Sequence, residues 1–288
     1  MAEIIEKGMV QGLIPIRMQD TNKGDYGRIL IVTGSAGMTG SGCLCASSTL
    51  LSGAGLVYVA VPDSLSEIYS LKLIEPIILK IPSINGVMAL RGLGTLESFL
   101  KSKDVVIIGP GLGRSFTTGR LVEEFVGRCE KPMVIDADGL NLLCGLNVLG
   151  NTKAPVIITP HPGEMARLCG ITIEEVQNNR IKVSTEFSGE YNVIVVLKGS
   201  KTVVAAPDGR VYINSTGNAG MATAGTGDVL AGLIGGLLGQ GLNPLDASIA
   251  GVFIHGAAGD LAAERKGQHG IIASDVAEAI PYCIKSLT

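Results

Sequence analysis

The chain reads Gly225-Thr226-Gly227-Asp228 and continues as VLAGLIGGLL over residues 229–238. Leucine and isoleucine recur there at the spacing of one helix face, so the segment predicts a helix with Asp228 in its first turn. The preceding glycines allow a tight turn whose N–H groups point outward. Together with the helix dipole, these groups favour an anion such as phosphate. A plain N-cap by Asp228 is the alternative interpretation of these four residues alone.

Six short apolar runs precede this segment. Each consists almost entirely of apolar residues without polar alternation, which is typical of strands covered on both faces in a parallel sheet. Helical candidates lie between them at 41–51, 117–126 and 173–188, so the sequence predicts an α/β fold with a mostly parallel central sheet. The predicted strands are 29–32, 56–61, 105–108, 133–135, 156–158 and 193–197.

The last third of the chain has a different pattern. Two short strands, 202–206 and 211–213, flank Pro207-Asp208-Gly209-Arg210 and predict a hairpin. Two helices, 229–238 and 245–261, are then expected to close the chain, with Pro244 starting the second. Because no repeat or linker divides the sequence, one domain over residues 1–288 is predicted.

Composition argues against several classes of function. The net charge of −3 offers no basic surface for nucleic acid. The longest apolar segment, 229–242, is rich in glycine and too short to span a bilayer comfortably, so no membrane association is predicted. Residues 1–7 carry acidic groups and no apolar signal-peptide core, which favours a cytoplasmic location. The six dispersed cysteines are expected to be reduced and buried.

Glycine-rich segments follow predicted strands, at the edge where open α/β sheets bind ligands. They are 34–42, after the first strand, and Gly109-Pro110-Gly111-Leu112-Gly113, after the third. The second segment lacks the G-x-G-x-x-G spacing of a dinucleotide fingerprint, so a hydride-transferring oxidoreductase ranks last among the functions considered. It can let a ligand approach the backbone closely, or it can be a plain tight turn.

The turn Thr159-Pro160-His161-Pro162-Gly163-Glu164 follows the fifth strand. Its prolines stiffen the chain, and the three-residue separation across a helix start can aim His161 and Glu164 at one cavity. Glu164 could hold a water of a hydrated Mg²⁺ ion, which prefers carboxylates and phosphate oxygens to a full protein cage. Helix capping by Glu164 beside a solvated His161 is the alternative.

Two further polar segments follow strands. Lys198-Gly199-Ser200-Lys201-Thr202 places a lysine and hydroxyls on a glycine turn, which suits phosphate binding, although a charged hairpin entry explains it as well. Asp136-Ala137-Asp138-Gly139-Leu140-Asn141 can orient a ligand or an ion, or cap the next helix. His255 lies among apolar neighbours and is expected to pack rather than to react.

Phosphoryl transfer is the chemistry that these segments support best. No Ser/His/Asp or Cys/His set has a local signature in the sequence. A helix N-terminus would neutralise the phosphate, Mg²⁺ would bridge its oxygens, and Asp228 would take the proton from the attacking hydroxyl.

Taken together, the motifs resemble the NAD(P)H-hydrate dehydratase family of the ribokinase-like fold. The resemblance covers nearly the whole chain, from Lys23 to Pro281, and rests on eight motifs in order. They are KGDYG (23–27), GSAGMTG (34–40), GPGLG (109–113), DADGLN (136–141), PHPGE (160–164), NAGMA (218–222), GTGD (225–228) and HGAAGD (255–260).

This resemblance implies a single-domain, three-layer α/β/α sandwich and a repair reaction. Hydration damages NADH or NADPH by leaving a hydroxyl group on the nicotinamide ring. Enzymes of the family phosphorylate this hydroxyl in the S form of the hydrates, NADHX and NADPHX, with ADP or ATP as the donor. Loss of phosphate then restores the reduced cofactor. The family also implies Mg²⁺ and a homotetramer.

Roles for named residues follow from the same resemblance. Asp228 corresponds to the catalytic aspartate, and the backbone of Gly225, Thr226 and Gly227 corresponds to an anion hole. Glu164 is the expected Mg²⁺ residue, through water. The adenine nucleotide site takes Lys198, Gly199, Ser200, Lys201, Thr202 and Gly227, and the hydrated nicotinamide site takes Ser41, Gly42, Gly113, His161 and Asp228. Ser41-Gly42 stands where the family usually has alanine.

Some relatives carry an N-terminal epimerase domain. Only 22 residues precede Lys23, so the epimerase is expected on a separate polypeptide.

Two other classes of function share these motifs. A small-molecule kinase of the same fold, for a vitamin precursor such as hydroxyethylthiazole, would release a stable phosphomonoester. A catalytically idle nucleotide-binding module would show no turnover, and the intact Asp228 argues against it.

Overall fold

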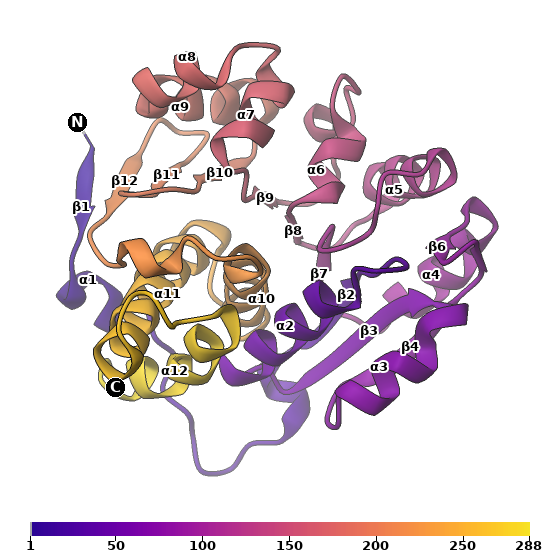
Figure 1. Cartoon of the computed structure of the whole chain (residues 1–288), viewed down its shortest axis with the longest axis horizontal. Helices are drawn as coiled ribbons and strands as arrows, with labels where there is room; N and C mark the ends of the chain where they lie inside the picture. The colour runs from indigo at the N-terminus through magenta and orange to yellow at the C-terminus, as the bar shows by residue number, and fades with distance from the viewer. Residues whose placement is uncertain (1) are drawn as a thin grey trace.

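A ten-stranded sheet forms the middle layer of the computed structural model, which describes residues 2–288 (Figure 1). Neighbouring strands run parallel except in the β10-β11-β12 meander, where both pairs are antiparallel. The strand order is β1 (Glu3–Ile5), β12 (Val211–Asn214), β11 (Val203–Ala205), β10 (Ile194–Leu197), β9 (Val156–Ile158), β8 (Met133–Ile135), β7 (Val105–Ile108), β2 (Arg28–Val32), β3 (Leu56–Pro62), β4 (Ile77–Ile81). A separate hairpin pairs β5 (Ser83–Ile84) with β6 (Val87–Met88).

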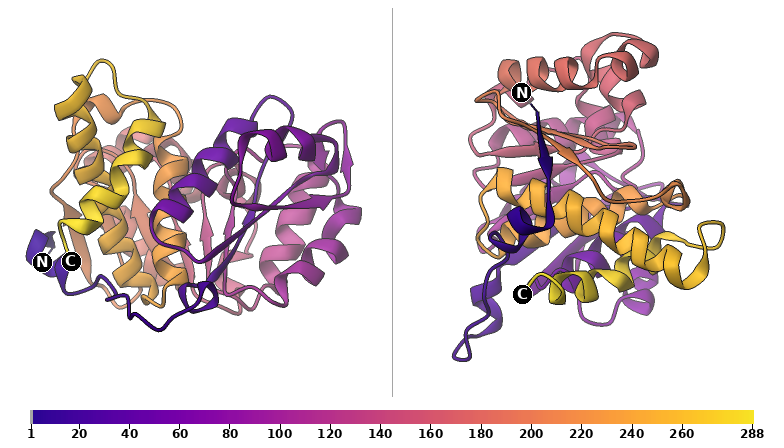
Figure 2. Two further views of the ribbon diagram at one scale, coloured as in Figure 1. Left: turned by 90° about the horizontal axis from the view of Figure 1, so that it is seen from below. Right: turned by 90° about the vertical axis from the view of Figure 1, so that its left-hand side faces the viewer.

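Helices cover both faces of the sheet, as Figures 1 and 2 show. One layer contains α1 (Lys7–Gln11), α2 (Thr39–Leu51), α3 (Ser66–Lys72), α10 (Thr226–Gly239), α11 (Pro244–Lys266) and α12 (Ala273–Lys285). The other contains α4 (Leu93–Leu100), α5 (Phe116–Arg128), α6 (Asp138–Leu143), α7 (Pro162–Cys169), α8 (Ile173–Asn178) and α9 (Arg180–Tyr191). The predicted three-layer α/β/α arrangement is therefore confirmed.

Two apolar cores separate along the sheet because successive strand side chains point to opposite faces. On β2, Ile29 and Ile31 pack in the core under α2 and α10. Leu30 and Val32 pack in the core under the other helix layer. All four side chains are fully buried, which explains why the sequence shows no polar alternation there.

All six predicted strands are present to within one residue at each end, and so is the hairpin after β10. The single helix predicted at 173–188 is wrong, because α8 and α9 are separate. At Asn179 the backbone leaves the helical conformation (φ −133°, ψ 36°), and its side-chain amide donates to the carbonyl of Glu175. An asparagine that bonds the local backbone in this way competes with helix continuation.

The prediction that two helices close the chain is also wrong, since α12 follows α11. Val276, Ala277, Ile280 and Cys283 form its apolar face and are buried against the core beneath α2 and α11. Strand β1 was not predicted either. It adds in parallel to β12 at the sheet edge.

None of the helices in residues 2–288 has the length and apolar character required to cross a bilayer.

Candidate active site

The N-terminus of α10 points at the carboxyl ends of the central strands. Gly225 is its N-cap and adopts a left-handed conformation (φ 91°, ψ −12°), where a side chain would also collide with Leu44. The first N–H groups of a helix lack intrahelical acceptors, so those of α10 are available to an anion. This position of the GTGD segment confirms the predicted turn and helix start.

Asp228 lies in the first turn of α10 and makes no capping hydrogen bond, because the N-cap position belongs to Gly225. The N-cap interpretation of Asp228 is therefore wrong. Burial raises the pKa of Asp228 to about 6, and the carboxylate of Asp136 adds to the rise, while the Ser41 hydroxyl and Lys198 oppose it. A carboxyl group with this pKa is ionised at neutral pH and basic enough to accept a proton from a hydroxyl group.

The ammonium group of Lys198 lies beside carboxylates that are next to Asp228. Its Nζ lies 2.6 Å from Asp136 Oδ1 and 3.9 Å from Glu164 Oε2. Asp136 Oδ1 also accepts a hydrogen bond from Thr159 Oγ1, at 2.7 Å. Although burial opposes the charge, the surrounding carboxylates hold the pKa of Lys198 above its usual value. A Cβ atom on Gly227 would lie 3.2 Å from Nζ, so the ammonium group sits directly beside the α10 N-terminus.

His161 and Glu164 form a capping box at the start of α7. His161 Nδ1 accepts from the Gly163 N–H at 2.9 Å, and Glu164 Oε2 accepts from the His161 N–H at 2.8 Å. The capping alternative is thus confirmed for Glu164, whose side chain is buried. His161 is half-exposed, and burial of the rest of its ring lowers its pKa. With Nδ1 used as an acceptor, the neutral ring carries its proton on Nε2.

The predicted nicotinamide-site residues come from four segments, two of which pack directly against each other. A Cβ atom on Gly111 would lie 3.0 Å from Ser41 Cβ, so the loop after β7 touches the start of α2. The Gly113 N–H donates to Asp138 Oδ2 at 3.0 Å. At Gly42 any side chain would meet Thr33 and the hydroxyl of Tyr69. Hydrogen bonding by the Ser41 hydroxyl lowers the pKa of Asp228 and so opposes the effect of burial.

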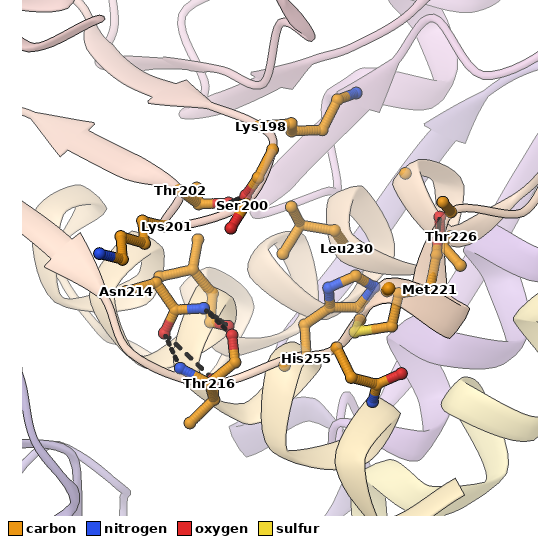
Figure 3. A pocket seen from close by; sticks show the side chains of 18 residues that line it. Lys198, Ser200, Lys201, Thr202, Asn214, Thr216, Met221, Thr226, Leu230 and His255 are labelled. Atoms are coloured by element: carbon orange, nitrogen blue, oxygen red, sulfur yellow. Dashed lines mark hydrogen bonds between the residues drawn. The ribbon is translucent and has the colours of Figure 1, made fainter. Parts of the chain in front are cut away.

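A pocket of about 510 Å³ opens beside this cluster (Figure 3). The loop 198–202, all five residues of which were predicted for a nucleotide, forms one wall. Thr226 and Gly227 at the start of α10 form another. Ser41, Gly113, His161 and Glu164 do not line it. The predicted site residues therefore form two groups around the α10 N-terminus. Residues 198–202, Thr226 and Gly227 line the pocket, whereas Ser41, Gly113, His161 and Glu164 lie outside it. Lys198 and Gly227 belong to both groups.

His255 on α11 also lines the pocket, which the sequence interpretation missed. Its Nε2 is buried and has no hydrogen-bond partner among residues 2–288, and burial lowers the pKa of the ring to about 4. The HGAAGD motif (255–260), which begins at His255, is the sequence signal that could have identified it. Within residues 2–288, no group of three His, Cys, Asp or Glu side chains is arranged to hold a metal ion.

Comparison with known proteins gives consistent matches. The model of the NAD(P)H-hydrate dehydratase family matches residues 29–282. The ADP-dependent (S)-NAD(P)H-hydrate dehydratase of Neisseria meningitidis is 37% identical over 94% of this chain and 90% of its own length. The bifunctional NAD(P)H-hydrate repair enzyme of Moorella thermoacetica is 45% identical over 95% of this chain but only 52% of its own, so the chain spans about half of that relative.

Among solved structures, the ADP/ATP-dependent NAD(P)H-hydrate dehydratase of Bacillus subtilis, co-crystallised with ATP and Mg²⁺, superposes with a TM-score of 0.88. The match covers 100% of this chain and 99% of the B. subtilis chain at 28% identity. These similarities confirm the predicted ribokinase-like α/β fold.

Proposed function

The chain belongs to the NAD(P)H-hydrate dehydratase family, and we propose that it dehydrates the S form of hydrated NADH and NADPH with ADP or ATP as phosphoryl donor. The observation that carries this proposal is Asp228, a partly buried carboxyl group in the first turn of a helix whose free N–H groups suit a phosphate. The Asp228 carboxylate can therefore accept the proton of a hydroxyl group while the N-terminus of α10 stabilises the transferred phosphate.

The reaction follows from these positions. Asp228 takes the proton of the ring hydroxyl, whose oxygen attacks the terminal phosphorus of the nucleotide and displaces the shortened nucleotide. The phosphate ester formed is adjacent to the ring nitrogen, whose lone pair expels phosphate. Loss of a ring proton then restores the carbon–carbon double bond of the reduced cofactor. We assign the pocket beside loop 198–202 to the adenine nucleotide, and Ser41, Gly42, Gly113 and His161 to the damaged nicotinamide nucleotide.

Glu164 is assigned to a hydrated Mg²⁺ ion that would neutralise charge on the phosphate oxygens. Glu164 Oε1 can accept a hydrogen bond from a water of the hydrated ion, since the capping hydrogen bond uses Oε2; His161 Nε2 lies 3.4 Å from the same Oε1. Glu164→Gln should raise the Mg²⁺ concentration for half-maximal rate. His161→Asn keeps an N-cap and should instead raise the apparent KM for the hydrated cofactor. Equal Mg²⁺ dependence of both variants would contradict this division.

One assay distinguishes the proposal from a kinase of the same fold. The protein is incubated with hydrated NADH, Mg²⁺ and either ADP or ATP, while free phosphate and the near-ultraviolet absorbance of NADH are recorded. A dehydratase produces both signals together. With hydrated NADH a vitamin-precursor kinase and an idle binding module produce neither signal, and only the kinase forms a stable phosphomonoester when hydroxyethylthiazole replaces the hydrated cofactor. Running both donors and both hydrated cofactors in parallel determines the preferred pair.

The proposal extends to the setting of the enzyme. We place it in the cytoplasm, where its nucleotide substrates occur, acting beside an epimerase activity that converts the R hydrate to the S form. We also propose a homotetramer, which light scattering on the purified protein can test. A monomer in solution at assay concentration would remove this part of the proposal.

A further inference from the structure

One arginine holds the wall of the nucleotide pocket from behind. Arg180 is the first residue of α9, and its Nη2 donates to the carbonyls of Leu197 at 2.8 Å and Lys198 at 3.3 Å. Its Nη1 donates to the carbonyl of Ser200 at 3.2 Å. A Cβ atom on Gly199 would lie 2.7 Å from Nη1, so the loop rests directly on the guanidinium group.

The loop's carbonyl and N–H groups are used differently. The carbonyls of Leu197, Lys198 and Ser200 are bonded to Arg180, and that of Gly199 accepts from Thr202 Oγ1 at 3.0 Å. The Lys198 N–H donates to the carbonyl of Pro160 at 2.8 Å. By contrast, the N–H groups of Gly199, Ser200 and Lys201 have no backbone acceptor within residues 2–288.

Peptide geometry fixes the direction of two of these free donors. Every peptide bond described is trans, and in a trans peptide the carbonyl and the following N–H point in opposite directions. Because the carbonyls of Lys198 and Ser200 point at Arg180, the N–H groups of Gly199 and Lys201 point away from it. Lys201 has a positive φ of 56°, a conformation that a residue other than glycine keeps only where its surroundings require it, and Gly199, at φ 138°, is a residue that adopts positive φ readily.

The pocket lies on the side to which these donors point. Helix α9 covers one face of the sheet, whereas α10 and α11, which line the pocket with the loop, cover the other (Figure 1). Arg180 itself does not line the pocket. The guanidinium therefore binds the loop from the side opposite to the ligand, and its fixed positive charge adds to the field behind the free N–H groups.

We propose that Arg180 is a positioning residue that fixes loop 198–202 with the N–H groups of Gly199 and Lys201 directed at acceptor atoms of the bound adenine nucleotide. This inference rests on the proposed nucleotide function of the pocket. Arginine suits the task because its planar fork offers several donors in fixed directions, whereas lysine has a single ammonium group that cannot bond all three carbonyls in this arrangement.

Steady-state kinetics of Arg180→Lys and Gly199→Ala test the proposal. Both should raise the KM for ADP or ATP roughly 10- to 100-fold, since each disturbs two or more donor positions. The KM for the hydrated cofactor and the kcat at saturating nucleotide should stay within about twofold of wild type. Lys182→Met, an exposed change two residues along α9, should alter none of the three values.

The outcomes separate positioning from simple structural support. An unchanged nucleotide KM in both variants overturns the proposal, as does a parallel loss in both KM values, kcat and the melting temperature without nucleotide. A nucleotide-specific rise in Arg180→Lys supports it, whereas a rise confined to Gly199→Ala shows that the loop acts without Arg180 and overturns it. Wild-type protein that turns over hydrated NADH confirms the proposed function independently, so failure of the Arg180 inference is not confused with failure of the enzyme assignment.

Discussion

Burial of the Asp228 carboxyl group links reactivity to stability. The folded protein keeps the Asp228 proton up to about pH 6, whereas the unfolded chain releases it near the ordinary pKa of 3.8. The folded state binds more protons in this window, so stability falls as the pH rises through it and stays lower above it. The ionised carboxylate therefore costs the folded state about 1–3 kcal/mol at neutral pH.

Asp228→Asn should separate the two properties. Turnover should fall about 10²- to 10⁴-fold because the proton acceptor is lost. The free energy of unfolding should instead rise at about pH 7, and less so at about pH 4, where the wild-type group is already largely protonated. Denaturant titrations at both pH values and initial rates check this. Near-normal turnover would remove Asp228 from the mechanism.

His255 should respond to acid in the opposite sense. Its pKa is lowered to about 4 in the folded protein from an ordinary value of 6.5. As the pH falls from about 6.5 to about 4, the unfolded chain takes up a proton that the folded chain does not. The free energy of unfolding therefore decreases over this range. Between about pH 7 and pH 4.5, the unfolding free energy of wild type should drop by about 2–3 kcal/mol more than that of His255→Asn. The exposed control His269→Asn should follow wild type; a His255 variant that does so too would contradict the prediction.

Among the secondary-structure elements, α10 depends on having no side chain at its second residue. A Cβ atom on Gly227 would lie 3.2 Å from Lys198 Nζ and 3.9 Å from Asp136 Oδ2, so alanine should displace the ammonium group. Alanine favours a helix, so the melting temperature should hardly fall. Turnover should decline by up to about 10-fold, because the ammonium group has to move by only a few tenths of an ångström, less than the ångström-sized misplacement that costs about 100-fold.

Gly94→Ala provides the matched control for Gly227→Ala. Gly94 is also the second residue of its helix, α4, and it is exposed with open space around it. Its substitution should leave turnover unchanged and stability equal or slightly higher. Comparable turnover in the two variants would show that the contact between Gly227 and Lys198 is not needed for catalysis.

The sequence predicted elements wherever local pattern determines them. Strands such as β2 are apolar on both faces, and this pattern depends only on their own residues. The break at Asn179 was missed because it depends on one side chain bonding the backbone of Glu175.

The motifs identified which residues gather at the site. They did not show which of these residues line the pocket and which lie outside it. Lys198 lies in the segment proposed to bind nucleotide, yet its ammonium group bonds Asp136, 62 residues away in the chain. Arg180 gives no motif signal because its hydrogen bonds within residues 2–288 all go to backbone carbonyls, which any residue type can supply.

At the level of the whole molecule, the pocket joins segments that are distant in the chain. The loop after β10, the start of α10 and His255 on α11 all line it. A ligand that contacts all three binds only where they are folded together, so binding stabilises the complete arrangement. Nucleotide-dependent stability is therefore a property of the whole fold and can be measured without the damaged cofactor.

ADP or ATP at about 100 times its Kd should raise the free energy of unfolding by about 2.7 kcal/mol. Lys198→Met should lower stability without nucleotide, because Asp136 is left buried without its cation. The additional effect of nucleotide must therefore be taken relative to each protein's own baseline. At the same nucleotide concentration it should shrink to about 1.4 kcal/mol if Kd rises tenfold, whereas the exposed control Lys182→Met should retain the full increment. If neither nucleotide stabilises wild type at millimolar concentration, the folded chain does not bind nucleotide at that concentration, and the proposed phosphoryl-donor site is wrong.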